Sequence, residues 1–293
     1  MTTYAHPDML VSTDWVQQNL DIGEFTLVEI DVDTAAYDQG HVPGAVGFNW
    51  QSQLMDQVNR DIIGRADFER LMGESGITPD DLVIVYGDNN NWFAAYGLWI
   101  MKYYGHTNVK LMNGGRVKWI KDGLPTTTER PHITPVTYRV SSTHPELRAL
   151  LPEVLDVVNR GDRNLVDVRS PDEFTGKVIA PPGMSETAQR AGHIPGAASV
   201  PWSKAVNEDS TFKSAEELRK LYVDDAGVDA SRETIAYCRI GERSSHTWFV
   251  LTYLLGLKNV KNYDGSWTEY GNVVGAPIVN ETRSKPAEVE VCQ

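Results

Sequence analysis

One short segment of the chain places a cysteine beside two arginines. Cys238 is followed directly by Arg239, and Arg243 comes soon after in the run Cys-Arg-Ile-Gly-Glu-Arg-Ser. A free cysteine has a pKa of about 8.5 and becomes a good nucleophile only when it loses its proton. Positive side chains, inward-pointing backbone N–H groups and a helix N-terminus all favour the thiolate. The segment therefore predicts nucleophilic thiol chemistry at Cys238.

The other residues of this segment suit a loop that surrounds a charged sulfur. Gly241 permits a backbone conformation that a residue with a Cβ disfavours. We expect the backbone N–H groups from Arg239 to Ser244, those of Ile240, Gly241 and Glu242 included, to point at the sulfur. The Glu242 side chain is expected to face solvent or an arginine. The alternative is an inert buried cysteine, which the two arginines and the position between a strand and a helix disfavour.

The chain also contains an internal repeat. The sequence His-x-Pro-Gly-Ala occurs at residues 41–45 and again at 193–197. Seven further identities share a single offset of 151, pairing Ile84, Tyr86, Gly105, Asn108, Val109, Lys110 and Gly114 with Ile235, Tyr237, Gly256, Asn259, Val260, Lys261 and Gly265. Such agreement predicts a duplicated domain.

Short β-branched runs alternate with longer helical patterns in both copies, which predicts an α/β fold. We expect two tandem domains, each with a parallel β-sheet flanked by helices on both faces. The predicted boundaries are 1–128 for the first domain and 147–280 for the second. The proline- and threonine-rich segment 129–146 is predicted to be an extended linker, and 281–293 a flexible tail.

Differences between the copies separate chemistry from scaffold. Gly87 occupies the position of Cys238 in the first copy, which also lacks both arginines, so only the second copy can perform thiol chemistry. His41 and His193 occur in both copies and are interpreted as turn or core residues. His246 has no counterpart, yet it lies on an otherwise apolar helix and is interpreted as a structural histidine with satisfied hydrogen bonds.

Two further residues follow the strand that opens the second copy. Asp167 and Arg169 replace Glu29 and Asp31 of the first copy, at the sheet edge where ligands of such folds bind. Arg169 is a candidate substrate-binding residue, supported by Asp167. The alternative, a salt bridge from Arg169 to Asp167 or Glu173, is equally consistent with the sequence.

The second copy also carries an insertion that the first copy lacks. Arg169 and His193 are 24 positions apart, against 10 for Asp31 and His41. Because an insertion after the carboxyl end of a strand lies beside the ligand site, we expect residues 177–190 to border its entrance.

Composition excludes several classes of function. The 293 residues carry a formal net charge of −13, which opposes binding to nucleic acid or anionic lipid. No apolar run is long enough to span a bilayer, and no secretory signal is evident. We therefore expect a cytoplasmic protein without nucleic-acid or membrane partners. Two cysteines and seven histidines form no metal-ligand spacing, so no metal or other cofactor is expected, and Cys292 is interpreted as incidental.

The duplicated domain, the first copy without cysteine and the Cys-Arg-x-Gly-x-Arg loop together resemble the two-domain rhodanese family. The run from Cys238 to Phe249 resembles the thiosulfate sulfurtransferases of actinobacteria in particular, and the segment Asn262-Tyr-Asp-Gly-Ser-Trp267 also fits. The resemblance implies transfer of the sulfane sulfur of thiosulfate through a Cys238 persulfide, with release of sulfite. Cyanide or a cellular thiol would accept the sulfur. Arg243, and then Arg239, would bind the sulfonate oxygens.

Three alternatives remain open. Phosphatases and arsenate reductases of this fold have one more residue between cysteine and arginine, so Ser244 lies where their arginine would be. The 3-mercaptopyruvate sulfurtransferases have a Cys-Gly-Ser-Gly loop and an arginine at the position of Glu173, and Ser170 and Glu173 here form the pattern of a helix capping box. A non-catalytic module that binds a partner is the simplest account of the first copy alone.

Overall fold

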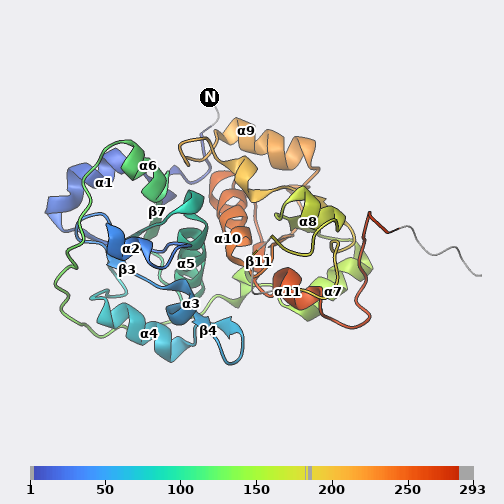
Figure 1. Cartoon of the computed structure of the whole chain (residues 1–293), viewed down its shortest axis with the longest axis horizontal. Helices are drawn as coiled ribbons and strands as arrows, with labels where there is room; N and C mark the ends of the chain where they lie inside the picture. Colours follow the sequence, from blue (N-terminus) through green and yellow to red (C-terminus); the bar gives the residue numbers. More distant parts are fainter. Residues whose placement is uncertain (1–2, 182, 184–186, 284–293) are drawn as a thin grey trace, which may run out of the picture.

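The computed structural model describes residues 3–181, 183 and 187–283, which form two α/β halves (Figure 1). The strands of the first half lie in the order β1 (Leu10–Val11), β7 (Val109–Met112), β6 (Leu82–Tyr86), β2 (Phe25–Glu29), β3 (Val46–Gly47). The strands of the second half lie in the order β11 (Val260–Tyr263), β10 (Thr234–Tyr237), β8 (Asn164–Asp167), β9 (Ala197–Ser199). Every pairing within these two sheets is parallel, which confirms the predicted class.

Helices surround both sheets (Figure 1). Those of the first half are α1 (Thr13–Asn19), α2 (Ala36–Gln39), α3 (Trp50–Gln53), α4 (Arg65–Glu74), α5 (Trp92–Tyr103) and α6 (Gly115–Lys121). Those of the second half are α7 (Leu151–Arg160), α8 (Pro171–Thr175), α9 (Ala215–Arg219), α10 (Glu242–Phe249) and α11 (Ser266–Tyr270). Short π-helical turns, Lys220–Asp225 and Val250–Leu254, extend α9 and α10. No helix in the described part of the chain is long and apolar enough to cross a bilayer.

Local sequence explains the strands that position the candidate site. The central strand β10 has the sequence Thr-Ile-Ala-Tyr, and all four residues are buried. Such runs are typical of parallel strands covered on both faces, because no side of the strand meets water. The strand is flanked by β8 and β11, with Tyr237 in register with Asp167 and Tyr263. The residue after Tyr237 therefore emerges in the middle of the carboxyl edge of the sheet.

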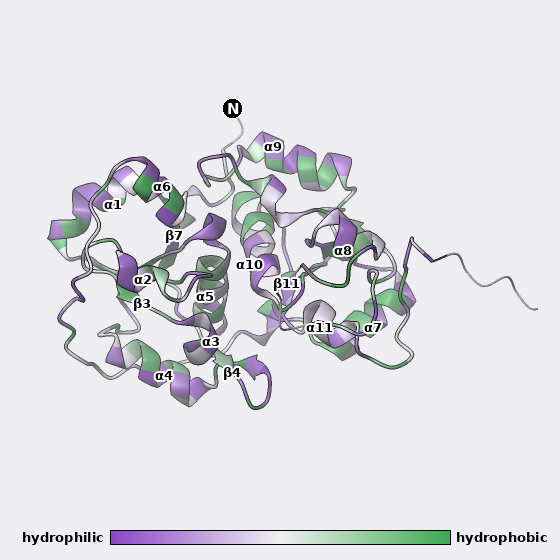
Figure 2. Cartoon of the chain, in the orientation of Figure 1, coloured by the Kyte–Doolittle hydropathy of each residue, from purple (hydrophilic) through white to green (hydrophobic). Residues whose placement is uncertain are grey.

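The two halves meet through α5 and α10, which pack side by side in the middle of the molecule (Figure 1). Figure 2 shows α5 as largely apolar, whereas α4 and α7 on the outside alternate between hydrophobic and hydrophilic residues. A single cluster of buried apolar side chains includes Trp99 of α5 and Trp248 of α10. The ring of Trp92 also lies 4.9 Å from the ring of Trp202. Because this apolar area would otherwise face water, the hydrophobic effect holds the halves together.

The segment between the halves follows the first half closely. Between Thr127 and Pro145 it forms neither helix nor strand. Even so, Tyr138 and Val140 are buried, and Glu69 of α4 accepts a hydrogen bond from the Val140 amide at 2.9 Å. The predicted extended linker is therefore packed along α4. Of the predicted tail, residues 284–293 lie outside the described residues.

An arginine at the end of this segment connects the first half with the site region of the second. Arg148 donates two hydrogen bonds of 2.8 Å to the carboxylate of Asp264. It also donates one of 2.5 Å to Asp61, which lies on β5 (Asp61–Ile62) of the hairpin that β5 forms with β4 (Met55–Asp56). The side chains of Arg148 and Asp264 are only 16% and 6% exposed. Water therefore screens this ion pair poorly.

We expect Arg148→Ala to lower the stability of the protein, because it leaves the buried carboxylate of Asp264 without a counter-ion. The expected loss is about 3 kcal/mol, measurable as a lower midpoint of thermal unfolding. Arg160→Ala is the matched control, because Arg160 pairs with Asp156 on an exposed helix face where ion pairs contribute little. Equal midpoints for the two variants would contradict the role assigned to Arg148.

Candidate active site

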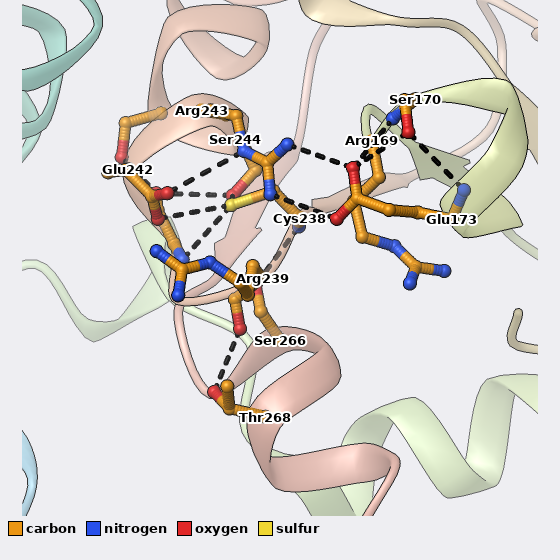
Figure 3. Close-up of polar contacts among 12 residues, drawn as sticks. Arg169, Ser170, Glu173, Cys238, Arg239, Glu242, Arg243, Ser244, Ser266 and Thr268 are labelled. Atoms are coloured by element: carbon orange, nitrogen blue, oxygen red, sulfur yellow. Dashed lines mark hydrogen bonds and ion pairs between the residues drawn. The ribbon is translucent and has the colours of Figure 1, made fainter. Parts of the chain in front are cut away.

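Cys238 lies where the sequence analysis placed it, directly after β10 and shortly before α10. Its side chain is fully buried. Figure 3 shows Glu242 and Ser244 beside the sulfur of Cys238. The Gly241 N–H donates to Sγ at 3.2 Å, and the thiol donates to Glu242 Oε2 at 3.3 Å. The Ser244 hydroxyl oxygen lies 3.6 Å from Sγ, and its proton goes to Asn262 Oδ1 at 2.6 Å. The loop thus surrounds the sulfur with polar groups, among which the carboxylate is the acceptor for the thiol proton.

The electrostatics of the thiol differ from the expectation. The pKa of Cys238 is raised, first by burial and then by the negative charge of Glu242, while Arg243 and Ser244 act in the opposite direction. Burial disfavours the charged form of any acid, and a neighbouring carboxylate adds to this effect. The sequence predicted a thiol whose pKa is lowered, whereas in this structure burial and Glu242 raise the pKa of Cys238.

The position of Glu242 was only partly predicted. The side chain is 2% exposed, so it does not face solvent. It faces an arginine, with Oε1 at 3.6 Å from Nε of Arg243, and its other oxygen faces the sulfur. The contact between Glu242 and the sulfur could not be predicted from the sequence, because residue spacing gives no side-chain direction within a loop.

Gly241 has the conformation for which a glycine was predicted. Its φ is +102°, and a Cβ would lie 2.6 Å from the Cα of Asp264. Side chains rarely adopt this backbone conformation, and the neighbouring backbone leaves no room for one. The glycine therefore lets the loop turn its amide toward the sulfur.

Residues of α11 hold the loop from the other side; two of them belong to the segment 262–267 that carries the family resemblance, but the sequence analysis assigned no role to any of them. The Ser266 hydroxyl accepts a hydrogen bond of 3.0 Å from the Cys238 N–H, and the Trp267 N–H donates to the Cys238 carbonyl at 3.1 Å. The Thr268 hydroxyl donates to the Arg239 carbonyl at 2.8 Å. Because α11 follows β11 at the same sheet edge, its first turn meets the backbone of the cysteine loop.

The two arginines of the loop are both largely buried. Arg239 is 8% exposed and Arg243 is 6% exposed. Nη1 and Nη2 of Arg243 contact the carboxylate of Glu173 at 3.2 and 3.4 Å. Burial opposes the charge of Arg243, but Cys238, Glu242 and Glu173 together raise its pKa. Arg243 is therefore a fixed positive charge beside the sulfur.

Glu173 has a larger role than the sequence analysis gave it. The predicted capping box is present, with Oε2 accepting from the Ser170 N–H at 3.0 Å. The same carboxylate also pairs with Arg243. Burial raises the pKa of Glu173, but Arg243 and Ser170 lower it by a larger amount. The net pKa is therefore below the ordinary value, and the residue stays ionised. One side chain thus caps α8 and orients the active-site arginine.

Arg169 adopts the salt bridge that the sequence left open as an alternative. The guanidinium is fully buried, donates to Asp167 at 2.6 Å and 3.0 Å, and donates to the Gly192 carbonyl at 2.7 Å. It lies 4.4 Å from the ring centre of Trp267 and is directed away from the sulfur in Figure 3. This geometry supports a positioning role for Arg169 rather than contact with a substrate.

The first half contains a comparable buried group without any cysteine. Glu29, the counterpart of Asp167, pairs with Arg116 and accepts a hydrogen bond from Tyr86. Asp31, the counterpart of Arg169, has its pKa raised to about 9 by burial and by Glu29, which keeps it neutral near pH 7. Because an acid and an arginine occur at this sheet edge in both halves, the arrangement serves the shared fold.

The loop of the first half has no room for a thiol. A Cβ on Gly87 would lie 2.0 Å from the Ile30 carbonyl oxygen. The Asn91 side chain accepts from the Gly87 N–H at 2.9 Å and donates to the Met112 carbonyl at 2.8 Å. The Asn91 amide thus binds the Gly87 N–H and the Met112 carbonyl. In the second half, the Ser266 hydroxyl binds the corresponding Cys238 N–H and Tyr263 carbonyl.

The histidines have structural positions. His41 stacks on Tyr37 with ring centres 3.8 Å apart, and His193 stacks on Phe174 at 3.6 Å, so the repeated motif makes the same contact twice. His246 is buried against Trp202 and Phe212. Neither of its ring nitrogens has a hydrogen-bond partner among the described residues, so the expectation of satisfied hydrogen bonds was wrong. Burial lowers the pKa of His246 to about 3 and keeps it neutral.

The described part of the insertion packs against elements of the site. Lys177 pairs with Asp172 of α8 at 3.1 Å. Arg190 donates to the carbonyls of Gly271 and Tyr270 at 3.0 and 3.1 Å, at the end of α11. Residues 182 and 184–186 lie outside the described residues. The insertion therefore joins the two helices that hold Arg243 and Cys238, and its place at an entrance stays a prediction.

The first half also reaches the site through a residue that the sequence analysis missed. Arg60, in the turn of the β4–β5 hairpin, donates to the Thr268 hydroxyl at 2.7 Å and to the Asp264 carbonyl at 3.4 Å. Thr268 in turn binds the backbone of the cysteine loop. Neither Arg60 nor Arg148 belongs to a motif, so only the tertiary contact identifies them.

Among the described residues, no group of three or more side chains is arranged to bind a metal ion.

Comparison with known families identifies both halves. The rhodanese-like domain matches residues 12–122 and again 150–272. The chain therefore belongs to the rhodanese-like family, and it is a sulfurtransferase with tandem domains.

Individual relatives are similar to this chain over nearly its whole length. A protein of Saccharopolyspora erythraea named "Putative thiosulfate sulfurtransferase" is 57% identical over 277 residues, covering 94% of this chain and 98% of its own. "Sulfur carrier protein TtuD" of Thermus thermophilus is 53% identical, with the same coverage of both chains. The solved wild-type structure of EanB has a TM-score of 0.84 at 24% identity, covering 96% of this chain and 71% of its own. That last likeness shows the fold alone.

We expect Cys238 to react slowly with iodoacetamide near neutral pH, because alkylation requires the thiolate and the folded protein raises the pKa of this thiol. At neutral pH the folded protein should be alkylated more slowly than the same thiol in the unfolded chain. Mass spectrometry of a Cys292→Ser background would report Cys238 alone. Faster alkylation in the folded protein than in the unfolded chain would show that the loop activates the resting thiol after all.

Proposed function

We propose that this protein is a thiosulfate sulfurtransferase that carries sulfur as a Cys238 persulfide. The observation that supports this most directly is the geometry of one buried thiol, bonded by the Gly241 amide and lying beside the paired Arg243. Thiosulfate, which the names of the relatives mention, is a small dianion whose sulfonate suits a site with two arginines. The proposed catalytic half spans residues 147–280. The half at 1–128, joined to it by residues 129–146, serves as a packing partner.

The reaction consists of two displacements. The Cys238 thiolate attacks the outer sulfur of thiosulfate, a new S–S bond forms, and the old S–S bond breaks with its electron pair leaving on sulfite. A nucleophile then attacks the outer sulfur of the persulfide, and the Cys238 thiolate leaves. Cyanide can accept the sulfur in an assay, and a thiol can accept it in the cell. The reaction needs no cofactor, because sulfur supplies both the nucleophile and the leaving group.

Each residue of the loop has a proposed role in this cycle. Arg243 and Arg239 stabilise the sulfonate and the developing negative charge by charge-assisted hydrogen bonds. The backbone of Ile240, Gly241, Glu242 and Ser244 surrounds the bound sulfur. Arg169 and Asp167 position α11 through Trp267 rather than touching the substrate.

Glu173 favours thiosulfate over 3-mercaptopyruvate. The family resemblance places a carboxylate-binding arginine at this position in the mercaptopyruvate enzymes. Here the side chain is an ionised carboxylate that already pairs with Arg243 and offers no positive charge to a substrate carboxylate. Transfer from mercaptopyruvate would therefore lack a binding contact that the mercaptopyruvate enzymes have.

Thiocyanate formation from thiosulfate and cyanide tests this proposal. Wild-type protein and Cys292→Ser should turn over equally, whereas Cys238→Ser should lose about a thousandfold or more, because serine cannot form the persulfide. Mercaptopyruvate and an aryl phosphate, run in parallel, should be poor substrates. Preference for mercaptopyruvate would overturn the donor assignment, and phosphate release would overturn the reaction class.

A further inference from the structure

We propose that the Glu242 carboxylate accepts the proton of the Cys238 thiol and holds it during sulfur transfer. This proposal rests on the proposed function, because it assigns a new catalytic residue to that reaction. In the proposed function, backbone amides and arginines of the loop stabilise the charged sulfur. That function gives no role to a carboxylate in contact with the nucleophile.

The geometry around the sulfur assigns the direction of the proton. Glu242 Oε2 lies 3.3 Å from Sγ, and an ionised carboxylate can only accept a hydrogen bond. The Gly241 N–H also reaches the sulfur, at 3.2 Å, and can only donate. The Ser244 hydroxyl is farther away, at 3.6 Å, and its proton is taken by Asn262 Oδ1 at 2.6 Å, so Glu242 is the nearest acceptor for the thiol. The thiol proton of the resting protein therefore points at Glu242.

Burial makes the contact consequential. Cys238 is fully buried and Glu242 is 2% exposed, so bulk water reaches neither atom readily. A thiolate beside an ionised carboxylate would place two negative charges in contact in a site of low dielectric constant. If the proton moves from Sγ to Oε2, the pair keeps a single negative charge throughout.

The surrounding charges are arranged for one negative charge on this pair. Arg243 faces both groups, with Nε at 3.6 Å from Glu242 Oε1, while Glu173 takes the other end of the same guanidinium. Arg239 belongs to the same loop. From α5 of the first half, Tyr96 lies within the electrostatic reach of Glu242, and Asp264 on the loop before α11 lies within reach of Tyr96. Arg243 is thus shared between two acids, so its positive charge is divided between Glu173 and the sulfur pair.

The proton balance then closes over the whole cycle. In the first displacement, Sγ–H gives its proton to Glu242, the thiolate bonds to the outer sulfur of thiosulfate, and sulfite leaves as a dianion. The persulfide anion stays beside a neutral Glu242. In the second displacement the acceptor takes the outer sulfur, the Cys238 thiolate leaves, and Glu242 returns the proton to it. No proton is exchanged with solvent, and no oxidant or reductant is needed.

The test compares wild-type protein with Glu242→Gln, which keeps the side-chain shape but cannot accept the proton. Sulfite release in the first turnover is measured from about pH 6 to about pH 8. The wild-type rate should be nearly independent of pH, because the proton moves within the pair. The variant rate should rise about tenfold per pH unit, because solvent must then remove the proton. Glu242→Asp should restore part of the flat profile.

Glu173→Gln is the matched control, since Glu173 is equally buried and binds the same arginine but does not touch the sulfur. This variant should change the rate and keep the flat profile. Circular dichroism establishes that each variant is folded. If the wild-type rate itself rises about tenfold per pH unit and Glu242→Gln is faster, Glu242 acts only as an unfavourable charge and the proposal is overturned. If wild-type protein releases no sulfite from thiosulfate at any pH, the proposed function fails instead.

Discussion

The buried ion pair between Arg243 and Glu173 is the contact on which the candidate site of the second half depends. A guanidinium that is 6% exposed needs a partner, because an unpaired buried charge costs several kcal/mol. Glu173 supplies the partner and at the same time caps α8 through Ser170. The start of α8 and the cysteine loop, about 70 residues apart, are therefore fixed relative to each other by one carboxylate. The positive charge that the sulfur needs is present before any substrate binds, so little reorganisation is required when charge develops.

The duplication shows which part of this electrostatic design belongs to the fold. Both halves bury an acid at the end of the strand that corresponds to β2 or β8, and both neutralise it with an arginine. That arginine is Arg116 in the first half and Arg169 in the second, and the two come from different elements of the repeat. Each half thus needs a positive charge beside this buried acid, but the arginine that supplies it comes from a different position in each half. In contrast, Cys238 and the arginines of its loop have no replacement around Gly87, so the first half lacks the side chains on which the proposed chemistry depends.

The first half still shapes the active site. Helix α5 packs along α10, the helix that begins at Glu242, so the backbone that carries the loop rests on the partner half. Arg60 binds Thr268, which donates a hydrogen bond to the Arg239 carbonyl. Arg148 binds Asp264, whose backbone lies close against Gly241. An apolar helix contact positions the start of α10, and a polar contact positions the start of α11. The first half, which lacks a cysteine in its own loop, therefore helps to position the cysteine loop of the second half.

The sequence by itself determined the duplication, the α/β class, the loop of Cys238 and the need for glycine at position 241, because these depend on identity and local spacing. It also indicated the capping box of α8, which is a local interaction. Only the tertiary structure decided the rest. It showed that Arg169 binds Asp167, that Glu173 reaches Arg243, that Glu242 turns toward the sulfur, and that burial raises the pKa of the Cys238 thiol. Each of these outcomes depends on desolvation and on side chains from distant segments, and a pKa or an ion pair is decided by such surroundings rather than by residue type.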